Sequence, residues 1–297
     1  MKANYITPAV TVFHKDGTIN FEETGKVYEH LIKGGVDGIL IMGSIGEFFA
    51  LTMEQKKELI HFAAEKIAHR VRLLAGTTSM VFDEIIELSK YAKEAGTDGV
   101  IILPPYYFPI SETGLETYYG KIAELLPDQD IYLYNFPDRT GYDVTPQVTL
   151  NLVKKYPNIK GYKDTQAGMD HTRELIKLIK AVRPDFEIYS GFDDNFAHNV
   201  LAGGDGCIAG LSNVLPELTH GWVEAFAKED LQKVQEIQQK IDILMEIYQV
   251  GKPFVPYIKA AMEEKGIIEN AASSFPFPEV TAEDRKQINE IMQKAGV

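Results

Sequence analysis

The chain has 297 residues, and its 30 Lys and Arg against 43 Asp and Glu give a formal net charge of −13. Apolar residues make up 45% of the chain and charged residues 25%, which is typical of a globular protein and argues against a disordered one. Because an acidic surface repels phosphate backbones, we expect no nucleic-acid partner.

Short apolar runs alternate along the chain with segments of helical periodicity. Three of these runs open on a related signal, Gly35-Val36-Asp37-Gly38, Gly96-Thr97-Asp98-Gly99 and Gly204-Asp205-Gly206, in which glycine ends a helix and a tight turn enters a buried strand. Further strands are predicted at 6–13, 72–77, 131–136, 159–163 and 187–191. Helices are predicted between the strands, at 21–33, 53–68, 82–94, 112–125, 146–156 and 170–182.

Eight such alternations in about 230 residues, without a glycine-rich dinucleotide loop, predict an α/β fold of the closed (β/α)₈ type, a TIM barrel. From about Leu215 onward the sequence indicates helices and no strand. We therefore expect a catalytic barrel over residues 1–225 and a C-terminal helical extension over residues 226–297, packed together as one structural unit.

A single cysteine, Cys207, excludes an intramolecular disulfide and a multi-cysteine metal site. The opening residues lack the apolar core of a secretory signal, and no apolar run approaches the roughly 20 residues of a membrane-spanning helix. We therefore expect a cytoplasmic protein without a membrane partner. No two of the seven histidines share a metal-ligand spacing, so no metal site is expected either.

In a barrel of this type the chemistry lies at the carboxyl ends of the strands. Alternation along the sixth strand places Ile159, Gly161 and Lys163 on one side, so Lys163 is expected in the barrel mouth. A lysine removed from water can become a neutral amine, which is the form that attacks a ketone to make a Schiff base. The alternative is a strand-end lysine whose amine reaches solvent.

Tyr134 ends the preceding strand, where its phenol could pass protons to and from groups bound at Lys163. The alternative is a core aromatic with a satisfied hydroxyl. Tyr107 has the same two interpretations on a loop.

Gly43-Ser44-Ile45-Gly46 could present backbone N–H groups to an anion. Asp193 and Asp194 could accept hydrogen bonds from substrate hydroxyls, or cap the helix that follows.

Taken together, the motifs resemble one family, the dihydrodipicolinate synthase / N-acetylneuraminate lyase family of class I Schiff-base aldolases. The motifs occur in that family's order and spacing and span essentially the whole chain: Gly43-Ser44-Ile45-Gly46-Glu47, Pro105-Tyr106-Tyr107, Tyr134 to Gly141, Gly161-Tyr162-Lys163-Asp164-Thr165 and Gly203 to Ile208. The resemblance implies a barrel with C-terminal helices, assembled as a homotetramer made of two dimers, or as a dimer.

The resemblance also implies roles for individual residues. Lys163 forms the imine with a 2-keto acid, Tyr134 shuttles protons, and Ser44 joins the relay, to which Tyr107 of a neighbouring subunit contributes. Backbone groups at Ser44, Ile45 and Ile208 hold the pyruvyl carboxylate. No organic cofactor is implied, because the lysine imine itself accepts electrons.

Two sets of residues imply different substrates. Arg139 matches the arginine with which dihydrodipicolinate synthases bind the carboxylate of aspartate semialdehyde. Against this, Ile45 replaces a threonine of those synthases, and the segment Gly191-Phe192-Asp193-Asp194 is similar to the hydroxyl-binding segment of lyases that cleave polyhydroxylated keto acids.

Because the segments around Gly141, Tyr248 and Pro253 also resemble 2-keto-3-deoxygluconate-type aldolases, the favoured function is reversible cleavage of a 2-keto-3-deoxy sugar acid to pyruvate and a hydroxyaldehyde. Three alternatives stay open: condensation of pyruvate with aspartate semialdehyde, a dehydratase that uses the same lysine, and a catalytically inactive keto-acid binding protein.

Overall fold

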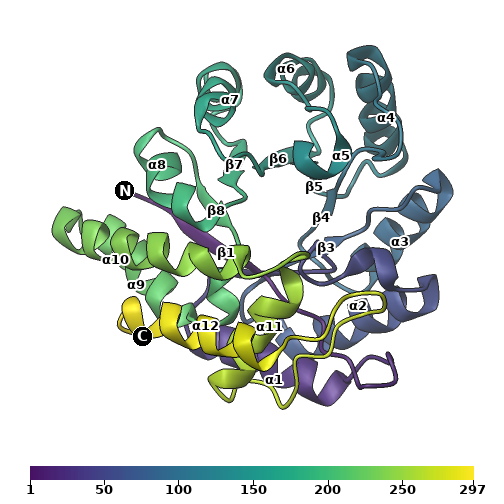
Figure 1. Ribbon diagram of the computed structural model, residues 1–297. Helices are drawn as coiled ribbons and strands as arrows, with labels where there is room; N and C mark the ends of the chain where they lie inside the picture. The colour runs from purple at the N-terminus through teal and green to yellow at the C-terminus, as the bar shows by residue number, and fades with distance from the viewer. The chain divides into compact units, whose positions relative to one another are not determined.

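Eight parallel strands close into a barrel in which neighbours along the chain are neighbours in the sheet. The structure is a computed structural model and describes residues 1–297 (Figure 1). The strands are β1 Asn4–Pro8, β2 Gly38–Ile41, β3 Arg72–Gly76, β4 Gly99–Ile102, β5 Ile131–Asn135, β6 Ile159–Asp164, β7 Glu187–Ser190 and β8 Gly206–Ile208. The predicted (β/α)₈ fold is confirmed.

Helices follow the strands and continue beyond the last one. They are α1 Phe21–Lys33, α2 Met53–Ile67, α3 Phe82–Glu94, α4 Glu112–Leu125, α5 Pro137–Thr140, α6 Pro146–Lys155, α7 Asp170–Lys180, α8 Phe196–Leu201, α9 Pro216–Ala227, α10 Leu231–Leu244, α11 Val255–Glu264 and α12 Ala282–Lys294, with short 3₁₀ helices η1 Phe48–Ala50, η2 Asp193–Asn195, η3 Leu211–Asn213 and η4 Met245–Gln249. All six predicted helices are present, with ends that differ by two residues at most. Several begin where a polar side chain accepts a bond from the first turn, as Asn20, Thr52, Ser111 and Thr145 do.

The first strand is shorter than predicted. β1 ends at Pro8, so the prediction of a strand over 6–13 is wrong beyond that residue. Val12 N–H donates to Thr24 Oγ1 at 3.1 Å, and Phe13 forms an isolated antiparallel bridge with Ile19. The apolar residues after Pro8 are therefore buried, as the residues of a core strand are. They contact α1 and the loop before it and do not extend the sheet.

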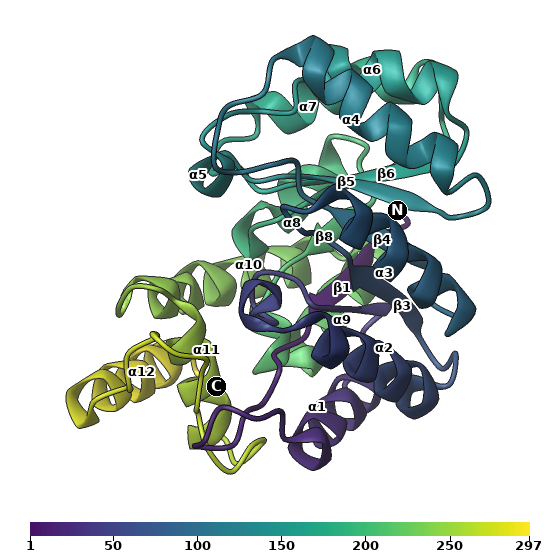
Figure 2. The same cartoon turned by 90° about the vertical axis from the view of Figure 1, so that its right-hand side faces the viewer.

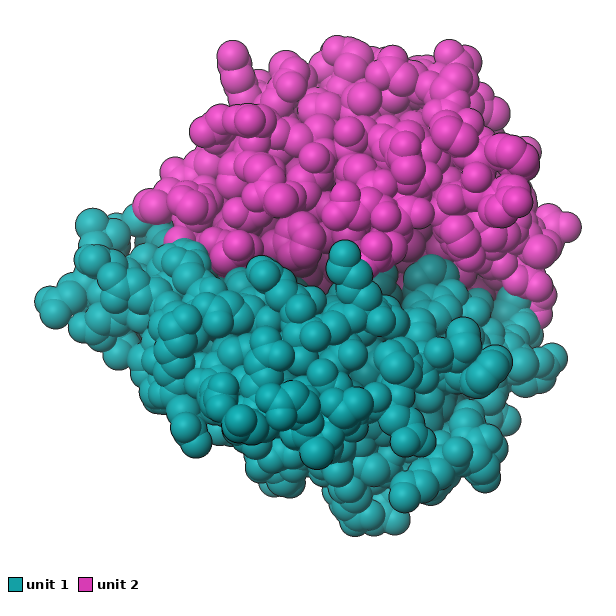
Figure 3. All heavy atoms as spheres, viewed as in Figure 1, with its two compact units in different colours: residues 1–72, 209–297 teal, residues 73–208 magenta.

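The chain divides into two compact units (Figure 3). Unit 1 comprises residues 1–72 and 209–297, and unit 2 comprises residues 73–208. Within unit 2, α4, α6 and α7 lie side by side, with β5 and β6 beneath them (Figure 2). Within unit 1, α9 packs against α10, and α11 packs against α12. The expected boundary between residues 225 and 226 falls near the end of α9 and stays a prediction.

Buried polar side chains in unit 2 gather where its strands end. Asn135, Lys163, Asp164 and Ser190 are all buried at the last one or two positions of β5, β6 and β7. The strand interiors are otherwise almost entirely apolar, so this edge is where the fold positions chemistry. None of the helices combines the length and apolarity that crossing a bilayer would require.

Candidate active site

Lys163 and Tyr134 lie next to each other. The parallel register of β5 and β6 pairs residue 134 with residue 163, and the Lys163 Nζ atom lies 4.3 Å from the centre of the Tyr134 ring. Each side chain is only 4% exposed. The Tyr134 ring also stacks on Phe136, with 6.0 Å between ring centres. The structure thus brings together the two residues that the sequence singled out, in a position largely removed from water.

A buried hydrogen-bond network fixes the strand ends that carry these two residues. Asp164 Oδ1 accepts from Asn135 Nδ2 at 3.0 Å, and Asp164 Oδ2 accepts from Thr172 Oγ1 at 2.6 Å and from His171 Nδ1 at 2.9 Å. Asn135 Nδ2 also donates to Asp143 at 3.1 Å. The network ties β5 and β6 to the start of α7.

His171 responds electrostatically to this network. Burial on its own would lower the pKa of His171, but the hydrogen bond to Asp164 and the negative charge of that carboxylate outweigh burial, so the pKa is raised. The sequence reasoning missed the network. Its one signal was the polar triplet that follows Tyr162, since polar residues at a strand end in an apolar core require partners.

Asp193 and Asp194 lie in the turn after β7, and Asp193 is almost fully buried. Burial raises the pKa of the Cys207 thiol well above its ordinary value, the charges of Asp193 and Asp194 raise it further, and the charge of Lys163 lowers it. Asp193, Asp194 and Lys163 are therefore all close enough to the buried Cys207 sulfur to affect its pKa. Neither η2 nor α8 begins with a side-chain cap, so helix capping does not account for the two carboxylates.

Gly191 and Thr165 fit closely against each other. A Cβ atom on residue 191 would lie 1.9 Å from Thr165 Oγ1, so only glycine is accommodated there. Thr165 is 4% exposed, and its hydroxyl has no hydrogen-bond partner. Buried hydroxyls are normally paired, so this one is available to a bound molecule. Thr165 was missed as a site residue, although its position two residues after Lys163 places both side chains on one face of the chain.

Arg139 and Tyr107 are exposed in unit 2. Arg139 lies in α5 with its guanidinium carbon 5.1 Å from the centre of the Phe136 ring. Tyr107 lies on the loop after β4, is 78% exposed, and meets the Phe108 ring edge-on at 4.9 Å. The Tyr107 hydroxyl forms no hydrogen bond within the chain, so the chain by itself does not bring it into a relay.

Ser44 and Ile45 belong to unit 1, in the turn that follows β2. The turn is sharp: Met42 and Glu47 on either side of it both have positive φ, 53° and 56°. Ile45 is buried against Gly210, where an added Cβ would lie 2.4 Å from Ile45 Cδ1. Ile208, the other predicted carboxylate-binding position, is the fully buried last residue of β8 in unit 2.

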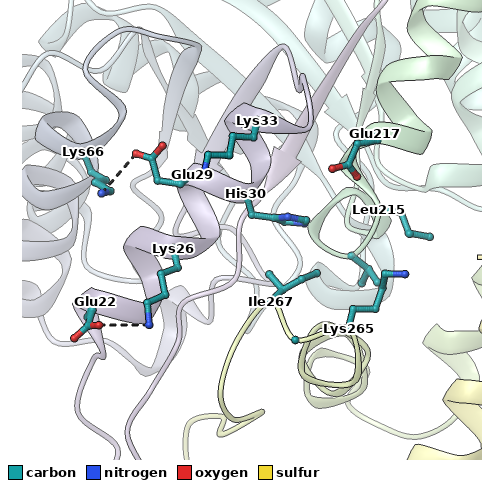
Figure 4. Close-up of a pocket in the computed structure, with 12 residues that line it drawn as sticks. Glu22, Lys26, Glu29, His30, Lys33, Lys66, Leu215, Glu217, Lys265 and Ile267 are labelled. Carbon is teal, nitrogen blue, oxygen red and sulfur yellow. Dashed lines mark ion pairs between the residues drawn. The ribbon is translucent and has the colours of Figure 1, made fainter.

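A separate cavity of about 780 Å³ lies in unit 1, between α1, α2, the start of α9 and residues 265–267. It contains none of the predicted site residues. Two of its four lysines pair with its own glutamates, Lys26 with Glu22 at 3.4 Å and Lys66 with Glu29 at 3.5 Å (Figure 4). This charged and open pocket is therefore distinct from the cluster around Lys163.

Comparison with known proteins agrees with this geometry. Residues 1–295 match the model of the dihydrodipicolinate synthetase family. A relative from Escherichia coli K12 named "Probable 2-dehydro-3-deoxy-D-pentonate aldolase YjhH" is 34% identical over 98% of this chain and 97% of its own length. A 4-hydroxy-tetrahydrodipicolinate synthase from Kosmotoga olearia is 34% identical, with 97% of each chain covered.

A third relative is similar in both sequence and structure. YagE of Escherichia coli K12, named "Putative 2-dehydro-3-deoxy-D-gluconate aldolase", is 37% identical over 86% of this chain and 85% of its own length. Its solved structure in complex with pyruvate superposes with a TM-score of 0.96 at 33% identity, and covers 99% of this chain and 98% of that chain. This chain therefore belongs to the dihydrodipicolinate synthetase family and is an enzyme of the lyase class.

Proposed function

We propose that the protein is a pyruvate-dependent class I aldolase that reversibly cleaves a 2-keto-3-deoxy sugar acid into pyruvate and a hydroxyaldehyde. The observation that carries this proposal is the buried Lys163 amine, 4.3 Å from the centre of the Tyr134 ring at adjoining strand ends. A buried amine beside a phenol combines a nucleophile with a group that can move protons.

In the proposed reaction, the neutral Nζ of Lys163 attacks the keto carbon, and loss of water gives a protonated imine. The electron pair of the C3–C4 bond moves into this imine as the bond breaks, while Tyr134 takes the proton of the C4 hydroxyl and the aldehyde leaves. Protonation of the enamine at C3 and hydrolysis then release pyruvate and regenerate the amine. The imine is itself the electron sink, so we propose no organic cofactor and no metal.

The remaining residues of the family pattern are proposed to bind and orient the substrate. Backbone groups at Ser44, Ile45 and Ile208 hold the pyruvyl carboxylate, and the Ser44 hydroxyl joins the proton relay. Tyr107 is proposed to act in the site of a second copy, which is supported by its exposure and by its unpaired hydroxyl. We accordingly propose a homotetramer built from dimers.

The free, buried thiol of Cys207 is compatible with the proposed cytoplasmic location.

Binding of a hydroxylated substrate is supported by polar groups near Lys163. The Asp193 carboxylate is buried, Thr165 carries an unpaired buried hydroxyl, and a Cβ atom at residue 191, which glycine lacks, would clash with that hydroxyl. The Thr165 hydroxyl suits a hydroxyl of a sugar acid, because an unpaired buried polar group gains most from a complementary partner. Two named relatives are described as aldolases for 2-dehydro-3-deoxy sugar acids.

Borohydride trapping tests the reaction type. Wild type and Lys163→Ala are incubated with pyruvate and borohydride, and their intact masses are compared. We expect a reduced pyruvyl adduct on the wild type only. No adduct on folded wild-type protein would overturn the aldolase proposal and favour a keto-acid binding protein.

A second candidate function is condensation of pyruvate with aspartate semialdehyde. It is favoured by Arg139, whose exposed guanidinium is free to bind a substrate carboxylate, and by the synthases among the relatives. Under this function, Arg139→Ala lowers kcat/KM for aspartate semialdehyde by about 100-fold and hardly affects 2-keto-3-deoxygluconate. The sugar-acid function predicts the reverse for Asp193→Ala and Asp194→Ala, whose losses should appear with 2-keto-3-deoxygluconate.

A further inference from the structure

Glu47 and Lys259 form an ion pair with no exposure to solvent. Glu47 directly follows the Gly43–Gly46 turn, and Lys259 lies in α11, 212 residues further along the chain. Both side chains are 0% exposed. The pKa of Lys259 is lowered, because the effect of burial exceeds the opposing effects of the Glu47 charge and of the hydrogen bond to Glu47. Neither residue has a part in the proposed reaction.

The partners of this pair come from several segments of unit 1. The second carboxylate oxygen of Glu47 accepts from Ser274 N–H at 2.7 Å, and Lys259 Nζ donates to the Ala272 carbonyl at 3.0 Å. The same Nζ lies 4.7 Å from the centre of the Phe13 ring. The pair thus links the turn after β2 with α11, with residues 272–274 and with the segment after β1.

A buried ion pair of this kind contributes little to the net stability of a fold. Removing two charges from water costs about as much as their attraction returns, and well-packed apolar residues usually do as well. A pair that is nevertheless buried and hydrogen-bonded at both ends is better explained by what it holds in place. Here it holds a non-glycine residue at φ 56°, a backbone conformation that a side chain rarely adopts without external support.

The turn held by Glu47 has little freedom on its other sides. Thr11 Oγ1 donates to the Gly46 carbonyl at 2.8 Å. A Cβ on residue 46 would lie 3.1 Å from both the Ala9 carbonyl oxygen and the Met42 nitrogen. Because Ile45 also packs against Gly210, a shift at Glu47 would be passed directly to Ser44 and Ile45.

We propose that Glu47 and Lys259 are positioning residues that set the affinity of the Ser44–Ile45 turn for the pyruvyl carboxylate. The helical extension thereby takes part in substrate binding from a distance, through α11. This inference rests on the proposed function, because it assumes that the turn binds the carboxylate of a keto acid. A misplacement of about 1 Å in such a turn is enough to weaken binding strongly.

The test separates affinity from chemistry. Glu47→Gln, Lys259→Met and the double variant are trapped with borohydride over a range of pyruvate concentrations. We expect the half-saturating pyruvate concentration to rise about ten-fold, while the trapping rate at saturation changes by no more than about two-fold. The double variant should be more stable than Lys259→Met, because no charge is left buried alone, yet keep the raised pyruvate requirement.

Arg285→Met is the matched control. Arg285 pairs with Glu263 and Glu264 at 2.8 and 3.0 Å, and so also joins elements of the helical extension, but it does not contact the turn. This variant should lose stability without any change in pyruvate dependence. Hydrogen exchange of residues 43–50 gives a second readout, and Glu47→Gln should accelerate it whereas Arg285→Met should not.

The outcomes distinguish the two proposals. Unchanged pyruvate dependence in Glu47→Gln, with a wild type that forms the adduct, overturns this inference and leaves the aldolase intact. A wild type that forms no adduct overturns the proposed function and the assigned role in pyruvate binding together. Because glutamine matches glutamate in shape, Glu47→Gln decides the question even where Lys259→Met fails to fold.

Discussion

At the scale of single residues, the position of Lys163 opposite Tyr134 follows from strand register. Parallel pairing sets residues 134 and 163 side by side, and partners in register project to the same face of the sheet. Because both are almost fully buried, protons exchanged between them do not have to compete with bulk water. In the proposed reaction the two residues have different roles: the Lys163 amine forms the covalent bond to the substrate, and the Tyr134 phenol transfers protons.

Tyr134→Phe should therefore separate covalent capture from turnover. We expect kcat for cleavage of 2-keto-3-deoxygluconate to fall by about 10²- to 10⁴-fold, because the proton acceptor is lost. The pyruvyl adduct on Lys163 should still form on long incubation. Rapid-quench measurement of pyruvate release, together with intact mass, checks both parts.

Tyr132→Phe is the control for this variant. Tyr132 lies on the same strand, and its hydroxyl donates to Glu187 Oε2 at 2.7 Å, away from the carboxyl end of β5. Its loss should cost about 1 kcal/mol of stability and leave kcat unchanged. A Tyr134→Phe enzyme that kept nearly all of its kcat would contradict the assigned role.

Thr165→Val tests whether the unpaired hydroxyl serves the substrate. Valine has nearly the same shape, and no hydrogen bond within the chain is lost, so the melting temperature should not fall. We expect kcat/KM for the sugar acid to drop by about ten-fold, with trapping of pyruvate itself unaffected. A drop of equal size for both molecules would place the hydroxyl on the pyruvyl part instead.

At the scale of elements, the regions predicted correctly are those whose pattern is local. Helices such as 21–33 and 82–94 are bounded by turn residues and by an apolar face, and the structure reproduces them. Local pattern also led to Lys163 and Tyr134. The local pattern predicted a strand after Pro8 wrongly, because the apolar run there packs against α1. Hydrophobicity predicts that a segment is buried, but not which element it packs against.

The pairs that the sequence did not reveal join distant segments. Glu47 and Lys259 are 212 residues apart, so no periodicity links them. Asn135 and Asp164 meet only because β5 and β6 align in that register. The Thr165 hydroxyl is unpaired because no hydrogen-bond partner lies within reach of it in the folded chain. The spacing of residues in the sequence cannot predict that.

The attachment of α7 to β6 should depend on pH through His171. The pKa of His171 is raised in the folded state, so the ion pair with Asp164 contributes stability fully below the unfolded value of about 6.5. That contribution is lost as the pH rises through the folded pKa. His171→Leu should therefore cost about 2 kcal/mol near pH 6 and less in alkaline solution, as measured by urea unfolding.

Thr172→Val provides the comparison at the same carboxylate. Its hydroxyl donates to Asp164 Oδ2 at 2.6 Å but does not titrate. The cost of this substitution should be the same at each pH. An equal cost of His171→Leu at every pH would show that His171 binds Asp164 as a neutral ring.

At the scale of the whole molecule, the exposed aromatic residues after β4 are not explained by the single chain. Tyr107 and Phe108 are 78% and 69% exposed and contact each other on the loop after β4. Large aromatic side chains that lie exposed next to each other are typical of protein–protein interfaces. If the hydroxyl of Tyr107 acts in the relay of a second copy, one active site contains residues of two chains.

Mixing two inactive variants tests this shared site. Tyr107→Phe and Lys163→Ala are each expected to be nearly inactive, the first through the site of the partner and the second through its own. When subunits are exchanged at random across a two-fold interface, half of the dimers are mixed, and each mixed dimer contains one site with both Lys163 and Tyr107. Mixing should then restore about one quarter of the wild-type activity. Activity that stays at the sum of the two parents, although mass spectrometry shows that mixed oligomers have formed, would mean that Tyr107 serves its own chain and that each site is complete within one subunit.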